Sequence, residues 1–294
     1  MAEVGLVAFA QIARQVAKAV VPAYKSKYSK RVFTQPQLLA VLCLMRYEDW
    51  TFREAEIRLT EHAELRAALN LKRTPDYTTL YRFLRRMEET IFTKALAEAV
   101  RRMPGPLPGG TTVAVDATGL ADGAISTFFV KRAREQGKEM PQRHWLKWLV
   151  VVDVPRRAVL AQHAKLGPVN DSATLRPLVD AAKQVAPIRL VLADAEFDSE
   201  CNHRYIRQVI GVDSIIPAKR GKAEWRVQGT RARMRTDFPT ARYSQRALAE
   251  SVISAVKRKL SARAPGRLLE TRCRQALLLR LAYDIYRLWV CPRP

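Results

Sequence analysis

Cysteine and histidine are scarce in this sequence, and neither residue is spaced for a metal site. No C-x2-C pair occurs among the four cysteines, Cys43, Cys201, Cys273 and Cys291, which argues against a structural zinc site. We expect reduced, mostly buried thiols, as in a cytosolic protein. The four histidines are dispersed along the chain, which argues against a catalytic centre built on histidine.

Long apolar runs and acidic residues are also few. No run of about 18 apolar residues occurs, so no membrane span is expected. No basic region precedes the apolar residues of the N-terminus, so we expect no secretory signal. The 28 acidic residues stand against 51 Lys and Arg, for a net charge of +23. This excess indicates a polyanionic partner, nucleic acid first and an anionic membrane second, without indicating sequence specificity.

Residues 104–110 (PGPLPGG) form the clearest break in the chain. Such a cluster of Pro and Gly interrupts helices and strands alike, so we place a domain boundary there. The prediction is a helical domain over residues 1–103, a linker over 104–110 and a second domain over 111–294. A chain of 294 residues is long enough for a catalytic domain and a smaller module.

The first domain is predicted to be all-helical. Apolar patterns of helical period run over residues 35–45, 50–60 and 63–69. Asp76 is placed to cap a further helix over 77–87, which carries Arg82, Arg85 and Arg86 on one side. Short helices that end in an Arg-bearing one indicate a helix-turn-helix-like module, in which these arginines would contact DNA. The alternative is an ordinary helical bundle with a charged outer face.

The second domain begins with β-rich runs and continues with alternating helical and β-rich ones. The predicted order is strand, strand, strand, helix, strand, helix, strand, helix, which indicates an antiparallel meander followed by α/β crossovers. The first strand, 111–116, ends in Asp116 before an expected turn over 117–119, and the fourth, 188–194, ends in Asp194. Each aspartate is either a ligand held by a rigid sheet or a cap on the following turn.

A helix is predicted over residues 243–257, which contain no Gly or Pro. At about 100° per residue, one face carries four polar side chains: Tyr243, Arg246, Glu250 and Lys257. The expected docked face, on the opposite side, carries Leu248, Val252 and Ala255. The polar stripe is then either a solvated face with an Arg–Glu pair or a functional surface.

The segment before this helix favours the functional reading. Residues 217–246 contain nine Lys or Arg and two acids. A single carboxylate in so basic a neighbourhood indicates a metal ligand beside a polyanion. A flexible basic loop over DNA is predicted to comprise Lys219, Arg220, Lys222, Arg226, Arg231, Arg233 and Arg235.

The spacing Tyr-x2-Arg-x3-Glu-x6-Lys at Tyr243, Arg246, Glu250 and Lys257 resembles the signature around the last acid of DDE transposases of prokaryotic insertion sequences. The stretch Asp194-Ala-Glu-Phe-Asp198 is similar to the Asp-x-Gly/Glu-Tyr/Phe pattern of the same family. The resemblance covers roughly residues 34–290. It implies an RNase H-like α/β fold, a mixed sheet of three antiparallel strands followed by α/β crossovers, behind an all-α N-terminal domain.

The resemblance also implies the chemistry. Asp116, Asp194 and Glu250 would be catalytic and hold two Mg²⁺ ions, with Mn²⁺ as a substitute. Water would cut DNA at the element ends, and the freed 3′-OH would attack target DNA. Arg246 and Lys257 would bind phosphates near the cut, and Tyr243 would pack on or hydrogen-bond the DNA backbone there.

Partners and alternatives follow from the same resemblance. The implied partner is double-stranded DNA, both the terminal inverted repeats and the target, bound by a homodimer on paired ends in the prokaryotic cytoplasm at the nucleoid. Three other acids are assigned lesser roles: Asp153 a hairpin turn, and Glu196 and Asp198 a supporting place near Asp194. Two alternatives remain: a domesticated or inactive transposase that acts as a DNA-binding protein, and an RNase H-like host nuclease.

Overall fold

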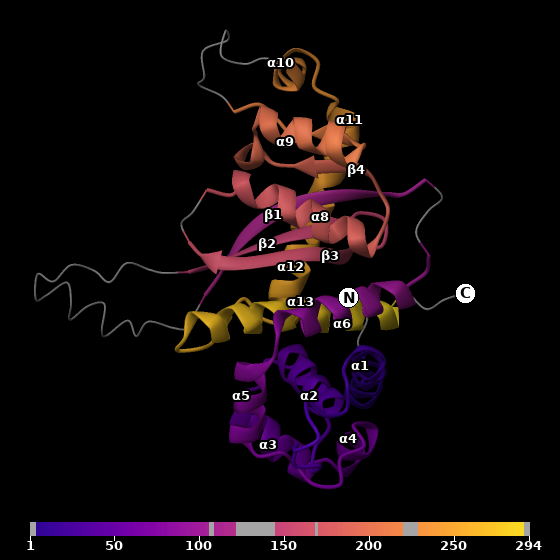
Figure 1. The fold of residues 1–294 in the computed structure, drawn as a ribbon, viewed down its shortest axis with the longest axis vertical. Coiled ribbons are helices and arrows are strands. Elements are labelled where there is room, and N and C mark those ends of the chain that lie inside the picture. The colour runs from indigo at the N-terminus through magenta and orange to yellow at the C-terminus, as the bar shows by residue number, and fades with distance from the viewer. Residues whose placement is uncertain (1–3, 106–108, 122–144, 168–169, 220–228, 291–294) are drawn as a thin grey trace, which may run out of the picture.

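The computed structural model of the chain describes residues 4–105, 109–121, 145–167, 170–219 and 229–290. Its centre is a mixed sheet with helices packed on both faces, and the N-terminal helices form a bundle at one end of the molecule (Figure 1). In the described residues no helix is long and apolar enough to cross a membrane.

The N-terminal part is helical, as predicted. Its helices are α1 (Leu6–Val20), α2 (Gln35–Tyr47), α3 (Phe52–Glu61), α4 (Ala63–Ala68), α5 (Tyr77–Arg86) and α6 (Glu89–Arg102). Thr34 and Thr51 begin α2 and α3 with capping boxes, in which the threonine side chain and a Gln or Glu three residues later bond each other's backbone N–H groups. Asp76 caps α5 by accepting a hydrogen bond from the N–H of Thr79 at 2.9 Å. These starts are therefore fixed by local sequence.

The sheet has five strands in the order β3-β2-β1-β4-β5. They are β1 (Thr111–Leu120), β2 (Leu146–Asp153), β3 (Ala158–Leu166), β4 (Ile188–Ala193) and β5 (Asp213–Ile215). Strands β1, β2 and β3 pair antiparallel, whereas β4 pairs parallel with both β1 and β5. This mixed sheet behind a helical region confirms the predicted RNase H-like α/β fold.

Helices cover both faces of the sheet. One face carries α8 (Leu175–Val185) and α9 (Glu200–Arg204), which continues into a π-helical turn over Tyr205–Ile210. The other carries α12 (Ala247–Lys259) and α13 (Leu269–Val290). Strand β1 is buried on both sides, which holds its side chains rigidly.

Strand β1 is longer than predicted. The expected turn over 117–119 does not form, because β1 continues to pair with β2 as far as Leu120 opposite Leu146. Asp116 therefore lies inside β1. Its pairing with β4 is shorter, however, and stops at Val115 opposite Ala193, one residue before Asp116.

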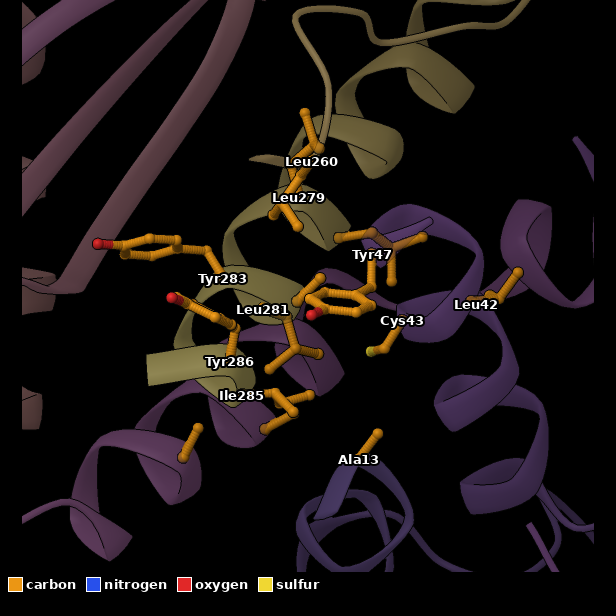
Figure 2. Close-up of a cluster of buried hydrophobic side chains, with 14 of the residues drawn as sticks. Ala13, Leu42, Cys43, Tyr47, Leu260, Leu279, Leu281, Tyr283, Ile285 and Tyr286 are labelled. Carbon is orange, nitrogen blue, oxygen red and sulfur yellow. The ribbon is translucent and has the colours of Figure 1, made fainter. Parts of the chain in front are cut away.

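Helix α13 joins the sheet to the N-terminal bundle. It packs on β3 and also on α1, α2 and α6. Figure 2 shows this shared cluster, in which Leu281, Ile285 and Tyr286 of α13 meet Cys43 and Tyr47 of α2. The sequence predicts only its packing on the sheet. The domain boundary at 104–110 stays a prediction.

A buried ion pair fastens α13 to the edge strand β3. Arg280 donates to the carbonyl of Val159 at 2.9 Å, and Asp284 accepts from the N–H of the same residue at 3.0 Å. Both side chains are buried. The pair thus satisfies backbone groups at a bulge where β2 and β3 shift register.

Candidate active site

The register of the two central strands brings Asp116 and Asp194 together. Both follow directly after the last β1–β4 pair, Val115 opposite Ala193. Neighbouring parallel strands lie about 5 Å apart, and residues at equivalent positions point to the same face. Asp194 begins the 3₁₀ turn over Ala195–Phe197 and accepts the N–H of Glu196 at 2.8 Å. Two carboxylates therefore meet where β4 separates from β1.

The polar residues of the predicted helix lie on three consecutive helical pieces. These are α11 (Thr240–Tyr243), a 3₁₀ turn over Ser244–Arg246 and α12. The prediction of one α-helix is wrong over 244–246, although the backbone there stays right-handed and helical. The ring of Tyr243 meets Phe238 edge-on, with 4.9 Å between ring centres.

The docked face of α12 is rotated from the predicted one. The side chains buried there are Ala249, Val252, Ile253 and Val256, while Leu248 and Ala255 are only partly covered. This rotation moves Arg246 and Lys257 from the outward stripe to the edge of the docked face, where both are half-buried. In this position both side chains reach polar partners on β1, Asp116 and Thr118.

Arg246 is the centre of these contacts. Its Nη1 lies 3.4 Å from Oδ1 of Asp116, and its Nη2 pairs with Oε1 of Glu250. The guanidinium carbon lies 5.8 Å from the ring centre of Tyr243, in a cation–π arrangement. Arg246 therefore links the acid of β1 to the acid of α12.

The ionisation of Asp116 reflects the neighbouring carboxylates. Burial raises the pKa of Asp116, and the charges of Asp194 and Glu250 raise it further, against the N–H of Ala117 and Arg246. Burial also raises the pKa of Tyr243, and the same two acids add to the rise. All three predicted acids thus lie within electrostatic reach of one another.

Lys257 points at the same end of β1. Its Nζ donates to Oγ1 of Thr118 at 2.5 Å. Burial lowers the pKa of Lys257, and the charge of Asp116 opposes that change. Thr118 was not singled out in the sequence, yet it stands two residues after Asp116 and so shares its face of the strand. Recognising that β1 continues past Asp116 would have identified it.

Carboxylate oxygens, which all three predicted acids supply, are ligands that Mg²⁺ takes. Over the described ranges, no three Asp, Glu, His or Cys side chains are grouped closely enough to hold a metal ion. Arg246 pairs with both Asp116 and Glu250, so its guanidinium supplies the positive charge that a metal ion would bring.

The other predicted DNA contacts lie on separate elements. Arg82, Arg85 and Arg86 are exposed on α5, in the N-terminal bundle (Figure 1). Lys219 is half-buried, and its N–H donates to Asp198 at 2.9 Å. Three further residues of the predicted basic loop lie outside the described residues: Arg220, Lys222 and Arg226.

Arg231 corrects the prediction of a flexible basic loop. It lies on α10 (Gly229–Thr236), together with Arg233 and Arg235, which are exposed. Arg231 itself is buried and binds Asp198 through two hydrogen bonds of 2.6 Å. A buried carboxylate requires such a partner, so this arginine is not free to bind phosphate.

The remaining acids have structural partners. Asp153 is buried and accepts from Thr111 at 2.9 Å and from Arg156 at 2.6 Å, as expected for a turn residue. Asp171, by contrast, makes no side-chain cap to the helical turn at 172. It is buried and pairs instead with Lys147 at 2.5 Å and Lys165 at 3.2 Å.

Comparison with known proteins identifies the family of the chain. A search of curated proteins finds no match. A family model described as a transposase DDE domain matches residues 107–285, which is more than half of the chain. The matched range contains the whole sheet, Asp116, Asp194 and Glu250. The chain therefore belongs to the transposase DDE domain family.

Proposed function

We propose that this chain is a transposase that cuts DNA at the ends of a prokaryotic insertion sequence and joins those ends to target DNA. The observation that carries the proposal is that Arg246 pairs with both Asp116 and Glu250. Asp194 lies beside Asp116, because each follows directly after the last β1–β4 pair. Membership of the family supports the reaction class.

The three carboxylates would hold two Mg²⁺ ions, or Mn²⁺ in their place, which activate an attacking oxygen and stabilise the leaving one. Arg246 and Lys257 bind and orient the phosphates of the DNA end with charge-assisted hydrogen bonds. Tyr243 packs beside them and limits the position of the backbone. Water and then the new 3′-OH are the attacking groups, so no side chain becomes bonded to DNA.

Two parts of the proposal rest on other surfaces. Arg82, Arg85 and Arg86 of α5 would bind duplex DNA away from the cut. The same role is proposed for Lys219, Arg220, Lys222, Arg226, Arg233 and Arg235. Paired element ends would be held by a homodimer in the cytoplasm, at the nucleoid.

Cleavage of a labelled duplex that carries the DNA flanking this gene tests the proposal. We expect Mg²⁺- or Mn²⁺-dependent cuts at the element ends, lost in Glu250→Gln and kept in Glu270→Gln. Glu270 is the matched control because it is an exposed glutamate that, like Glu250, pairs with an arginine four residues away on a helix. Equal cleavage by Glu250→Gln would mean that the third acid lies elsewhere.

Two other outcomes would favour the alternatives. Tight DNA binding without cleavage by the wild type would indicate an inactive or domesticated DNA-binding protein. Metal-dependent cleavage of an RNA/DNA hybrid, with the duplex left intact, would indicate a host nuclease.

A further inference from the structure

Asp198 is the buried carboxylate nearest in sequence to the predicted metal ligand Asp194. Its side chain is fully buried, and Arg231 binds both of its oxygens at 2.6 Å. Burial by itself raises the pKa of Asp198, but Arg231 and the N–H of Lys219 hold that pKa below its usual value. The pair is therefore ionised and fully hydrogen-bonded.

Asp198 and Glu200 hold the start of helix α10. Asp198 binds Arg231 and also accepts the N–H of Lys219 at 2.9 Å. Glu200 accepts the N–H groups of Thr230 at 3.2 Å and Arg231 at 3.1 Å, at the start of α10. Two neighbouring acids therefore anchor the first turn of α10.

Asp198 is held close to the predicted metal ligand Asp194. A single 3₁₀ turn, Ala195–Phe197, connects Asp194 to Asp198. Phe197 is fully buried, and its carbonyl accepts from the side chain of Asn202 at 2.9 Å. Movement of Asp198 relative to Asp194 is therefore restricted.

Asp198 is also joined to the helices that carry the other site residues. Helix α10, which bears Arg231, leads through α11 to Arg246 and Glu250. A second ion pair, Arg242 with Asp213 at 2.9 Å, holds α11 against the edge strand β5, but it is largely exposed and contributes little. The buried Asp198–Arg231 pair is the stronger tether.

Stability alone is a weak reason for such a pair. Desolvating two charges costs several kcal/mol, and apolar residues of similar size often stabilise a fold equally well. What a bidentate ion pair adds is a fixed orientation of the two elements that it connects.

We propose that Asp198, bound to Arg231, is a positioning residue that fixes helix α10, with its exposed Arg233 and Arg235, relative to Asp194. The DNA end bound by these two arginines is then held in register with the carboxylates that cut it. This inference rests on the proposed function, which names the DNA end as the substrate.

The test compares Asp198→Asn with Asp153→Asn. Asp153 is the matched control because it is fully buried and bound to an arginine three residues away, at the hairpin turn. We measure single-turnover cleavage of the labelled element end at saturating DNA and map the cut. We expect Asp198→Asn to cut about tenfold or more slowly and at scattered positions, because misplacement by about 1 Å is enough to lower a rate severely.

Arg231 supplies a conservative variant. Arg231→Lys keeps the charge and should retain more of the rate and accuracy than Arg231→Met. A purely structural role would lower thermal stability in Asp198→Asn and Asp153→Asn alike, and leave the cut position unchanged in both. Wild-type rate and position in Asp198→Asn would overturn the inference.

Limited trypsin digestion separates this inference from the proposed function. If wild type cuts no DNA, the proposed function fails, but the tether is still measurable. We expect faster cleavage within α10, after Arg231, Arg233 and Arg235, in Asp198→Asn than in the wild type or Asp153→Asn. Equal digestion rates in all three proteins would overturn the tether itself.

Discussion

Arg246 should compete with metal ions for Asp116 and Glu250. At 3.4 Å and an effective dielectric constant of about 20, the attraction between Arg246 and Asp116 is about 5 kcal/mol before desolvation. Because the Arg246 side chain is only 17% exposed, desolvation offsets most of this attraction. We therefore expect a net contribution of about 1–2 kcal/mol to the metal-free protein.

Arg246→Met removes that contribution while keeping an unbranched, flexible side chain. The metal-free variant should unfold roughly 2–8 °C below the wild type. Since no guanidinium then has to be displaced, the variant should bind the metal ion about 5- to 30-fold more tightly than the wild type. Added Mg²⁺ should accordingly stabilise the variant more than it stabilises the wild type.

Thermal unfolding with and without Mg²⁺, together with Mn²⁺ binding followed by electron paramagnetic resonance, measures both effects without DNA. Arg242→Met is the control, because Arg242 lies four residues earlier and pairs with Asp213 outside the site. Metal affinity in Arg246→Met that is equal to or weaker than in the wild type would refute the reasoning.

Three further predictions concern stability. Asp284→Ala should cost about 3–5 kcal/mol in chemical denaturation, because Arg280 stays buried without its countercharge. Burial raises the pKa of Asp284 to about 7, so the free energy of unfolding should fall as pH rises from about 4 to 7. Asp284→Asn should lack this fall, and a pH profile identical to that of the wild type would contradict the prediction. Asp76→Ala should cost about 1 kcal/mol of unfolding free energy by removing the cap of α5. Hydrogen bonds from Thr78 and Thr79 lower the pKa of Asp76 to about 2, so the stability that Asp76 contributes should be present above about pH 4 and lost toward pH 2. The unfolding free energy of Asp76→Ala, measured against pH, should lack this loss. Gly167→Ala should cost about 1–3 kcal/mol, because the new Cβ would lie 2.7 Å from Nε1 of Trp145; unchanged tryptophan fluorescence and stability would show that the ring moves freely.

Local sequence was enough for the type of most predicted elements and for the starts of the capped helices. Caps such as Asp76 act within one turn of helix, so a short window contains both partners. The acids Asp194 and Glu250 were identifiable for a similar reason, since one closes a β-rich run and the other belongs to a fixed spacing with Arg246. Whether these acids act as metal ligands stays a prediction.

The predictions that failed depended on neighbours distant in sequence. The end of β1 could not be derived because β2, which follows after a long interval, extends the pairing to Leu120. The docked face of α12 was misjudged because apolar residues lie on more than one side, and only the position of Asp116 and Thr118 selects which side turns inward. Arg231 was indistinguishable in sequence from its basic neighbours until Asp198 was seen to bind it.

The sequence by itself determined the fold class, the capped helix starts and the candidate site residues, because those properties depend on side chains within a few positions of one another. Tertiary structure alone decided which of those residues meet. The β1–β4 register sets Asp116 beside Asp194, and the docking of α12 brings Arg246 and Glu250 to them. Burial then paired Arg231 with Asp198 rather than leaving it exposed, because a buried, ionised carboxylate is costly without a charged or hydrogen-bonding partner.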